Sequence, residues 1–96
     1  MDNHFVTDTI VNLENAESVK IHGYALIDKA SDKVTIDLAS LKHANSVTIA
    51  VLCAWHRYAA RRDMSAVFIN LDEELRNIIV LSGLQDVLLL NESTNP

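Results

Sequence analysis

The side chains that could carry out metal or nucleophilic chemistry are few and scattered. The four histidines are His4, His22, His43 and His56, and none has a second histidine at the i, i+4 spacing by which a helix presents two metal ligands. The single cysteine, Cys53, could pair with His56, but no acid lies nearby in the sequence to orient that histidine. The chain also lacks a phosphate-binding glycine loop, a dinucleotide-binding glycine pattern and a paired-cysteine zinc motif. We therefore expect no metal, no cofactor and no catalytic activity.

One hydroxyl stands at a position where it could be functional. In the segment KHANSVTIAVLC, residues 42–53, a polar cluster leads directly into an apolar run. Either Asn45 or Ser46 can cap the helix that begins there, by accepting a hydrogen bond from an amide two or three residues later. The amino end of a helix is also a favourable position for a phosphate. Capping is the simpler interpretation, and Ser46 is in addition a candidate phosphorylation site.

Two clusters of charge lie at the ends of expected helices. Three acids, residues 72–74, come at the start of one helix, and Arg57, Arg61 and Arg62 come at the end of another. Both placements are favoured by the helix dipole, which explains the acids without general-acid chemistry. The three arginines could also meet an acidic partner.

The size and charge of the chain exclude several classes of function. With 96 residues it is long enough for one domain with a thin core. A net charge of −5 argues against nucleic-acid binding, which needs a positive face. We expect no signal segment, because no hydrophobic stretch precedes the N-terminal MDNHFVTD, and the apolar stretch 47–60 is too short to span a membrane. We expect a cytoplasmic protein that reaches a membrane only through a partner.

The apolar pattern predicts strands and helices that alternate along the chain. The clearest strand is 33–38, where Val34, Ile36 and Leu38 alternate with polar residues. We expect one or two short strands in the stretch 4–13. The other expected elements are a helix over 16–30, a helix over 46–62, a strand over 65–70, a helix over 71–84 and a last short strand over 87–90.

This order of elements also predicts where a site would lie. Strands that alternate with helices form right-handed crossovers and a partly parallel sheet, and ligands usually bind at the carboxyl ends of such strands. The segment 42–48 follows the strand 33–38 and lies at that end. For the helix 71–84, we expect Asn70 and Glu73 to form a capping-box-like start and Gly83 to adopt the left-handed conformation at its end.

The stretch 47–60 is more apolar than a helix on one side of a sheet requires. One of its faces carries Ile49, Leu52, Cys53, His56 and Ala60, and another carries Val51, Trp55 and Tyr58. One face should pack on the sheet. The other is a candidate contact surface, because Trp and Tyr are favoured interface anchors, unless neighbouring helices of the same domain cover both faces.

The order of these segments resembles the STAS domain, a module shared by bacterial anti-sigma factor antagonists and the cytoplasmic tails of sulfate transporters. The matching segments are VTIDLASL, NSVT, IAVLCAWHRYAARRD, SAVFIN and LDEELRNIIVLSGL, and IDLASL and VLSGLQDVL are the most specific parts. The resemblance covers roughly 10–90 and implies an α/β fold in one STAS-like domain, residues 1–96, with a flexible tail at 91–96. It implies a mixed, partly parallel sheet of about four strands, packed with three or four helices.

Within this family, the chain is most similar to the STAS subunit of the bacterial phospholipid-transport ABC complex that maintains outer-membrane lipid asymmetry. The resemblance implies a non-catalytic subunit that binds and supports the ATPase subunit, in a complex with permease and substrate-binding subunits. Such a subunit is cytoplasmic and peripheral at the inner membrane. The expected partner-binding residues, on the loop and the helix after it, are His43, Asn45, Ser46, Val47, Thr48, Ile49, Trp55 and Tyr58.

The alternative within the family is an anti-sigma factor antagonist controlled by phosphorylation of a serine. Ser46 matches the position of the family's phosphorylated or contacting hydroxyl. Asn45 stands where that pattern usually has Asp, and Thr48 stands where it usually has Gly. Because the acid and the glycine help to present the hydroxyl, these differences favour a constitutive contact at the loop. A small enzyme and a self-associating domain are the remaining alternatives.

Overall fold

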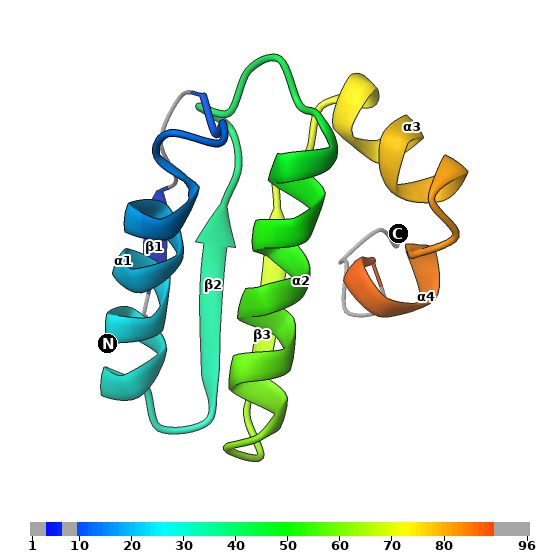
Figure 1. Cartoon of the computed structure of the whole chain (residues 1–96). Coiled ribbons are helices and arrows are strands. Elements are labelled where there is room, and N and C mark those ends of the chain that lie inside the picture. The colour runs from blue at the N-terminus through cyan, green and yellow to red at the C-terminus, as the bar shows by residue number, and fades with distance from the viewer. Residues whose placement is uncertain (1–3, 7–9, 90–96) are drawn as a thin grey trace.

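Strands and helices alternate along the chain in the computed structural model, which describes residues 4–6 and 10–89. The elements in these ranges are, in order, β1 (His4–Val6), α1 (Ala16–Lys29), β2 (Lys33–Asp37), α2 (Ser46–Ala60), β3 (Ser65–Ile69), α3 (Glu73–Leu81) and α4 (Gln85–Leu88) (Figure 1). The first five elements form two consecutive strand–helix–strand units, which is how parallel strands must be connected.

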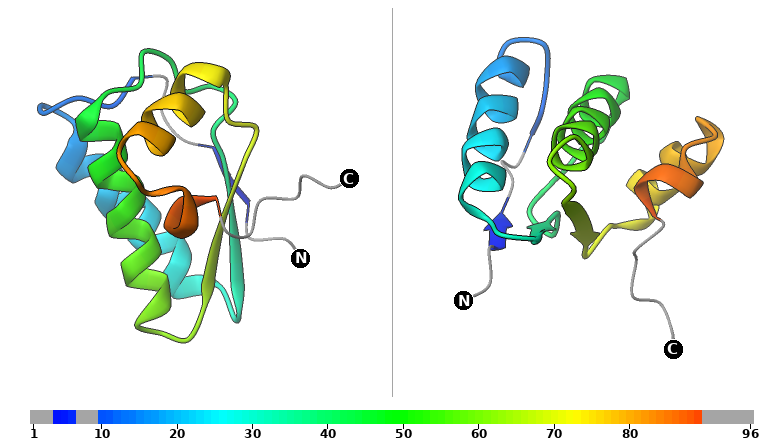
Figure 2. Two further views of the ribbon diagram at one scale, coloured as in Figure 1. Left: turned by 90° about the vertical axis from the view of Figure 1, so that its right-hand side faces the viewer. Right: turned by 90° about the horizontal axis from the view of Figure 1, so that it is seen from below.

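The sheet is parallel throughout its described part, with the strand order β1-β2-β3. In the register of β2 and β3, Val34 lies opposite Ala66 and Ile36 lies opposite Phe68. These four side chains are buried, because alternate residues of each strand point to the same face and the helices cover that face. Figure 2 shows α1 and α2 together on one side of the sheet.

Helix α2 lies in the middle of the helical layer. It contacts α1 on one flank and α3 and α4 on the other, and it also packs on β3. Neighbouring helices therefore cover both of the apolar faces that the sequence predicts for this helix. Of the two expectations, the structure supports the one in which helices of the same domain cover both faces, although a furrow lined by Val47 and Ala50 stays open to solvent beside α1.

The burial of Trp55 follows from a glycine on the neighbouring helix. Gly23 of α1 faces the indole ring, and a Cβ atom at Gly23 would collide with that ring. The indole N–H donates a hydrogen bond to the backbone carbonyl of Lys20 at 3.1 Å. With 0% of its surface exposed, Trp55 belongs to the core. Its expected role as an interface anchor is wrong for this reason.

The α/β fold class is confirmed, and the predicted helices and strands correspond to α1, β2, α2, β3 and α3. The strand expected at 87–90 is wrong, because Gln85–Leu88 forms α4. Gly83 ends α3 with φ +74°, as expected, and the turn after it brings Leu88 into the core. The described sheet accordingly has three strands instead of about four. Residues 7–9, residue 90 and the tail 91–96 lie outside the described residues.

The start of α3 also differs from the expectation. Its cap is Asp72, whose carboxylate accepts a hydrogen bond from the Leu75 amide at 2.8 Å. Asn70 has φ +60° and donates a side-chain hydrogen bond to Asp37 at 3.1 Å. Asn70 therefore connects the carboxyl ends of β2 and β3, and the helix begins only after it.

Candidate functional site

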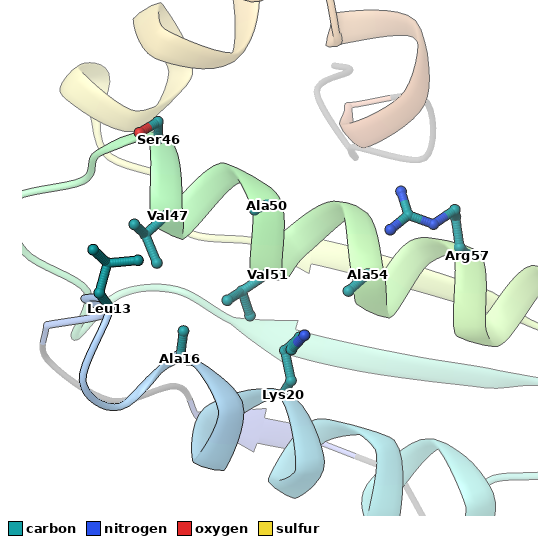
Figure 3. A pocket seen from close by; sticks show the side chains of 9 residues that line it. All are labelled: Leu13, Ala16, Lys20, Ser46, Val47, Ala50, Val51, Ala54 and Arg57. Atoms are coloured by element: carbon teal, nitrogen blue, oxygen red, sulfur yellow. The ribbon is translucent and has the colours of Figure 1, made fainter.

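A groove runs along the surface between α1 and α2 (Figure 3). It has a volume of about 370 Å³, is open to solvent, and extends along α2 from its first turn to its last. Eleven residues of helix at 1.5 Å each give it a length of about 16 Å. Its lining residues come from the segment before α1 and from the two helices: Leu13, Ala16, Lys20, Ser46, Val47, Ala50, Val51, Ala54 and Arg57.

Small side chains open this groove. Ala50 and Ala54 are one turn apart on α2, and Ala16 faces them from α1 (Figure 3). Three methyl groups fill little of the space between the helices, so a furrow remains open to solvent. Leu13 forms part of the wall and keeps 85% of its surface exposed. An exposed leucine beside a groove of alanines leaves apolar surface that another molecule can cover.

The start of α2 is held by a capping box. The side-chain oxygen of Asn45 accepts hydrogen bonds from the amides of Val47 at 2.8 Å and Thr48 at 3.2 Å. The Asn45 amide in turn donates to the hydroxyl of Thr48 at 3.2 Å. Asn45 is therefore the cap, which answers the question that the sequence leaves open between Asn45 and Ser46.

Asn45 also fixes the opposite wall of the groove. Its side-chain nitrogen donates to the carbonyl of Val11 at 3.2 Å, so the chain before α1 is tied to the start of α2. The same chain segment is held in a turn by Asn12 and Asn15, each of which accepts a hydrogen bond from the other's amide. Leu13 lies inside this turn and is positioned by it.

Ser46 has an available hydroxyl at the end of the groove. It is the first residue of α2 and is exposed, and its side chain makes no hydrogen bond with the described residues. The neighbouring loop is conformationally unusual, because its exposed residue His43 has a positive φ of +54°. Non-glycine residues in this left-handed region cluster at functional sites. The loop thus presents one side chain, and Ser46 one hydroxyl, beside an apolar furrow.

Seven of the eight predicted partner-binding residues fall into three groups. Ser46 and Val47 line the groove, and His43 and Asn45 lie on the loop at its end. Thr48 and Ile49 are buried, at 1% and 7% exposure, because the capping box and the core occupy them. With Trp55, these two residues are corrected from surface contacts to interior residues.

Tyr58 lies at the far end of α2, outside the groove. Its ring stacks on Tyr24 of α1, with centroids 4.1 Å apart, and its hydroxyl donates to the carboxylate of Asp28 at 2.9 Å. The guanidinium carbon of Arg62 lies 3.7 Å from the Tyr58 ring centroid, and its Nε is 3.1 Å from Asp28. These contacts clamp the ends of α1 and α2 together.

Sequence reasoning missed the half of the groove that α1 contributes. Leu13, Ala16 and Lys20 are far from α2 in sequence, and no spacing rule connects them to it. Two signals were nevertheless present. Leu13 is an apolar residue within a polar turn, and Ala50 and Ala54 repeat at the i, i+4 spacing that places both on one helical face.

The groove is positively charged although the chain is acidic overall. Among the described residues, Lys20 and Arg57 are the charged ones that line it, and no carboxylate of this part of the chain does. Glu17 pairs with Lys20 at 3.3 Å in an exposed bridge, whereas no described carboxylate pairs with Arg57.

Burial raises the pKa of the Cys53 thiol, and the positive charge of Arg57 opposes that shift.

The described part of the chain shows no group of three or more His, Cys, Asp or Glu residues that could hold a metal ion. Among the same residues, no helix is both long enough and apolar enough to cross a membrane.

Comparisons with known proteins agree with this architecture. Residues 8–91 match a family model described as "Mlab, STAS domain". Among solved structures, the chain is similar to one chain of the Acinetobacter MlaFEDB complex in an ATP-bound conformation. The two are 32% identical with a TM-score of 0.79, and the match covers 88% of this chain and 90% of the other. The search of curated proteins finds no match.

Proposed function

The chain belongs to the STAS domain family of the Mlab type, and from this premise we propose that it is a non-catalytic subunit of a bacterial phospholipid-transport ABC complex. In this role it binds the ATPase subunit on the cytoplasmic side of the inner membrane and supports its assembly and activity. The transporter maintains the lipid asymmetry of the outer membrane.

The likeness to the Acinetobacter complex supports this role through its extent. The match covers nine-tenths of a chain in that assembly, so a domain of this size and fold has a place in such a complex. That assembly was solved in an ATP-bound state, so it contains an ATP-binding component, and we propose an equivalent component as the partner of this chain. The neighbour in turn accounts for membrane association, since no helix among the described residues is long and apolar enough to span a membrane.

The geometry at the start of α2 is the observation that carries the proposal. Ser46 presents an exposed hydroxyl on a helix end that the Asn45 capping box makes rigid. The groove beside it offers apolar surface, with Leu13 and Val47 as walls. A rigid polar group gives direction to a contact, and apolar area supplies affinity, which is the composition of a protein interface.

Co-purification with the ATPase subunit tests this proposal. We expect Ser46→Arg to break the complex, because a bulky cation would occupy the contact, while Ser46→Ala should have a mild effect. Ala60→Arg is the matched control, since Ala60 is exposed at the opposite end of the same helix. Full retention of the ATPase by Ser46→Arg would exclude this loop as the contact. If the wild-type protein retains no ABC ATPase from its native host, the proposed function itself is wrong.

The exposure of Ser46 also favours a second candidate function, that of an anti-sigma factor antagonist. A phosphate on Ser46 would lie at the amino end of α2 and add about −1.5 to −2 charge. Intact-mass measurement of the protein from its native host distinguishes the two. A fraction of chains that carries one phosphate and changes with growth conditions supports the antagonist, and an unmodified chain throughout argues against it.

A further inference from the structure

The groove between α1 and α2 has a shape that limits what can bind in it. Its floor is made of Ala16, Ala50 and Ala54, and its length of about 16 Å equals about five residues of extended chain or three turns of helix. An apolar furrow of this length suits a single peptide segment with apolar side chains. It does not enclose a small molecule, because it is open along its length.

The charge of the groove adds a second requirement. Lys20 lies on its α1 rim and Arg57 at its far end on α2, and no acid stands among the described lining residues. The helix dipole explains why arginines occur near the end of α2, but it applies equally to Arg61, which does not line the groove. An apolar furrow that ends at a cation with no carboxylate partner among the described residues is complementary to an apolar segment carrying a carboxylate.

We propose that this groove binds a short apolar segment of the ATPase subunit, with an Asp or Glu side chain of that segment set against Arg57. The inference rests on the proposed function, since it assigns the groove to the same partner. The assignment is supported by the continuity of the groove with the proposed loop contact. Ser46 and Val47, which form that contact, are also the first lining residues on α2. A segment that contacts Ser46 and continues along α2 reaches Ala50, Ala54 and finally Arg57.

The charge requirement is tested by exchanging single arginines. Arg57→Glu should weaken binding of the purified ATPase subunit roughly tenfold, with a smaller loss at high salt, because it sets a carboxylate against a carboxylate. Arg61→Glu is the matched control: the change in charge is the same, and Arg61 lies about one turn further along the chain and outside the groove. It should change the affinity less than twofold. An equal effect of the two exchanges, or no effect of Arg57→Glu, overturns the charge requirement.

The occupant is identified by photo-crosslinking in the native host. A benzoylphenylalanine residue at Ala50 lies in the middle of the groove, and the same residue at Ala60 lies outside it. We expect Ala50, but not Ala60, to crosslink to an apolar segment of the ATPase subunit that contains Asp or Glu, as read by mass spectrometry. Thermal unfolding of both variants shows that the fold is retained.

The outcomes of the co-purification and crosslinking experiments distinguish a failure of the groove inference from a failure of the proposed function. If the ATPase co-purifies but Ala50 crosslinks to a second copy of this chain, to a segment without an acid, or to nothing, the groove inference is wrong and the proposed function stands. A crosslink to a protein outside the transporter, with no ATPase retained, overturns both.

Discussion

The indole ring of Trp55 occupies the space that a side chain at Gly23 would fill, so α1 and α2 approach each other closely at this point. The same ring donates a hydrogen bond to the carbonyl of Lys20, a residue whose side chain lines the groove. The packing of Trp55 against Gly23 in the core therefore also helps to fix the position of Lys20 in the wall of the groove.

Gly23→Ala should destabilise the protein because its methyl group would collide with the indole ring. Overpacking of this kind costs about 1–3 kcal/mol, and the better helix propensity of alanine returns less than about 1 kcal/mol. We expect a net loss in the free energy of unfolding, measured by urea denaturation. Ser18→Ala, at an exposed position of the same helix, is the control and should not destabilise. Equal stability of Gly23→Ala and the wild type would contradict the packing described for Trp55.

Asn45→Ala should remove both the cap of α2 and the tie to Val11. Loss of an N-cap residue costs about 1 kcal/mol, with a range of roughly 0.5–2 kcal/mol. Asn45→Asp keeps the capping oxygen and loses only the side-chain donor, so its unfolding free energy should fall between those of Asn45→Ala and the wild type. Ser46→Ala should lie within about 0.5 kcal/mol of the wild type, because Ser46 is exposed and does not cap the helix. If Ser46→Ala were the more damaging change, the assignment of the cap would be wrong.

The pKa of Tyr58 should be above the ordinary tyrosine value, chiefly because its hydroxyl donates a hydrogen bond to Asp28; partial desolvation adds to the shift, and Arg62 opposes it. A raised pKa means that the folded state holds the proton more tightly than the unfolded state. The contribution to stability is therefore present below the ordinary tyrosine pKa and is lost as the pH rises through the folded value. Ultraviolet titration should show this tyrosine ionising late, and Asp28→Ala should lower its pKa. An unchanged titration curve in Asp28→Ala would exclude the hydrogen bond as the cause.

Cys53 should react slowly with iodoacetamide because burial raises its pKa and leaves little thiolate at neutral pH. The positive charge of Arg57 opposes this shift, so Arg57→Gln should raise the pKa further and slow alkylation at mildly alkaline pH. Arg61→Gln is the control and should leave the rate unchanged. A faster reaction in Arg57→Gln would mean that the arginine shields the thiol instead of stabilising the thiolate.

Much of the fold could be read from local pattern. Val34 and Ile36 alternate with polar residues as a half-buried strand requires, and they form the core of β2. The Ser-Gly-Leu segment near position 83 predicts the end of α3 because the left-handed conformation there favours glycine. The family resemblance, carried by the order of such segments, is confirmed by the match over residues 8–91.

The remaining features depend on contacts that local pattern does not contain. A short apolar run such as VLLL is compatible with either a strand or a buried helix, and only the turn at Gly83 leads its first two residues, Val87 and Leu88, into α4. An aromatic residue on an apolar helix can be core or interface, and the choice for Trp55 depends on Gly23, on another helix. The groove likewise exists only because Ala16 of α1 meets Ala50 and Ala54 of α2.

The tie between Asn45 and Val11, together with the Trp55 packing, has a kinetic consequence. Both walls of the groove are in position before any partner arrives, so binding requires little reorganisation of this chain. An encounter should then proceed without a slow conformational step, at about 10⁵–10⁷ M⁻¹s⁻¹, as for other docking reactions between preformed surfaces. Substitutions along the groove would act mainly on how long the assembled complex lasts, and much less on how quickly it forms.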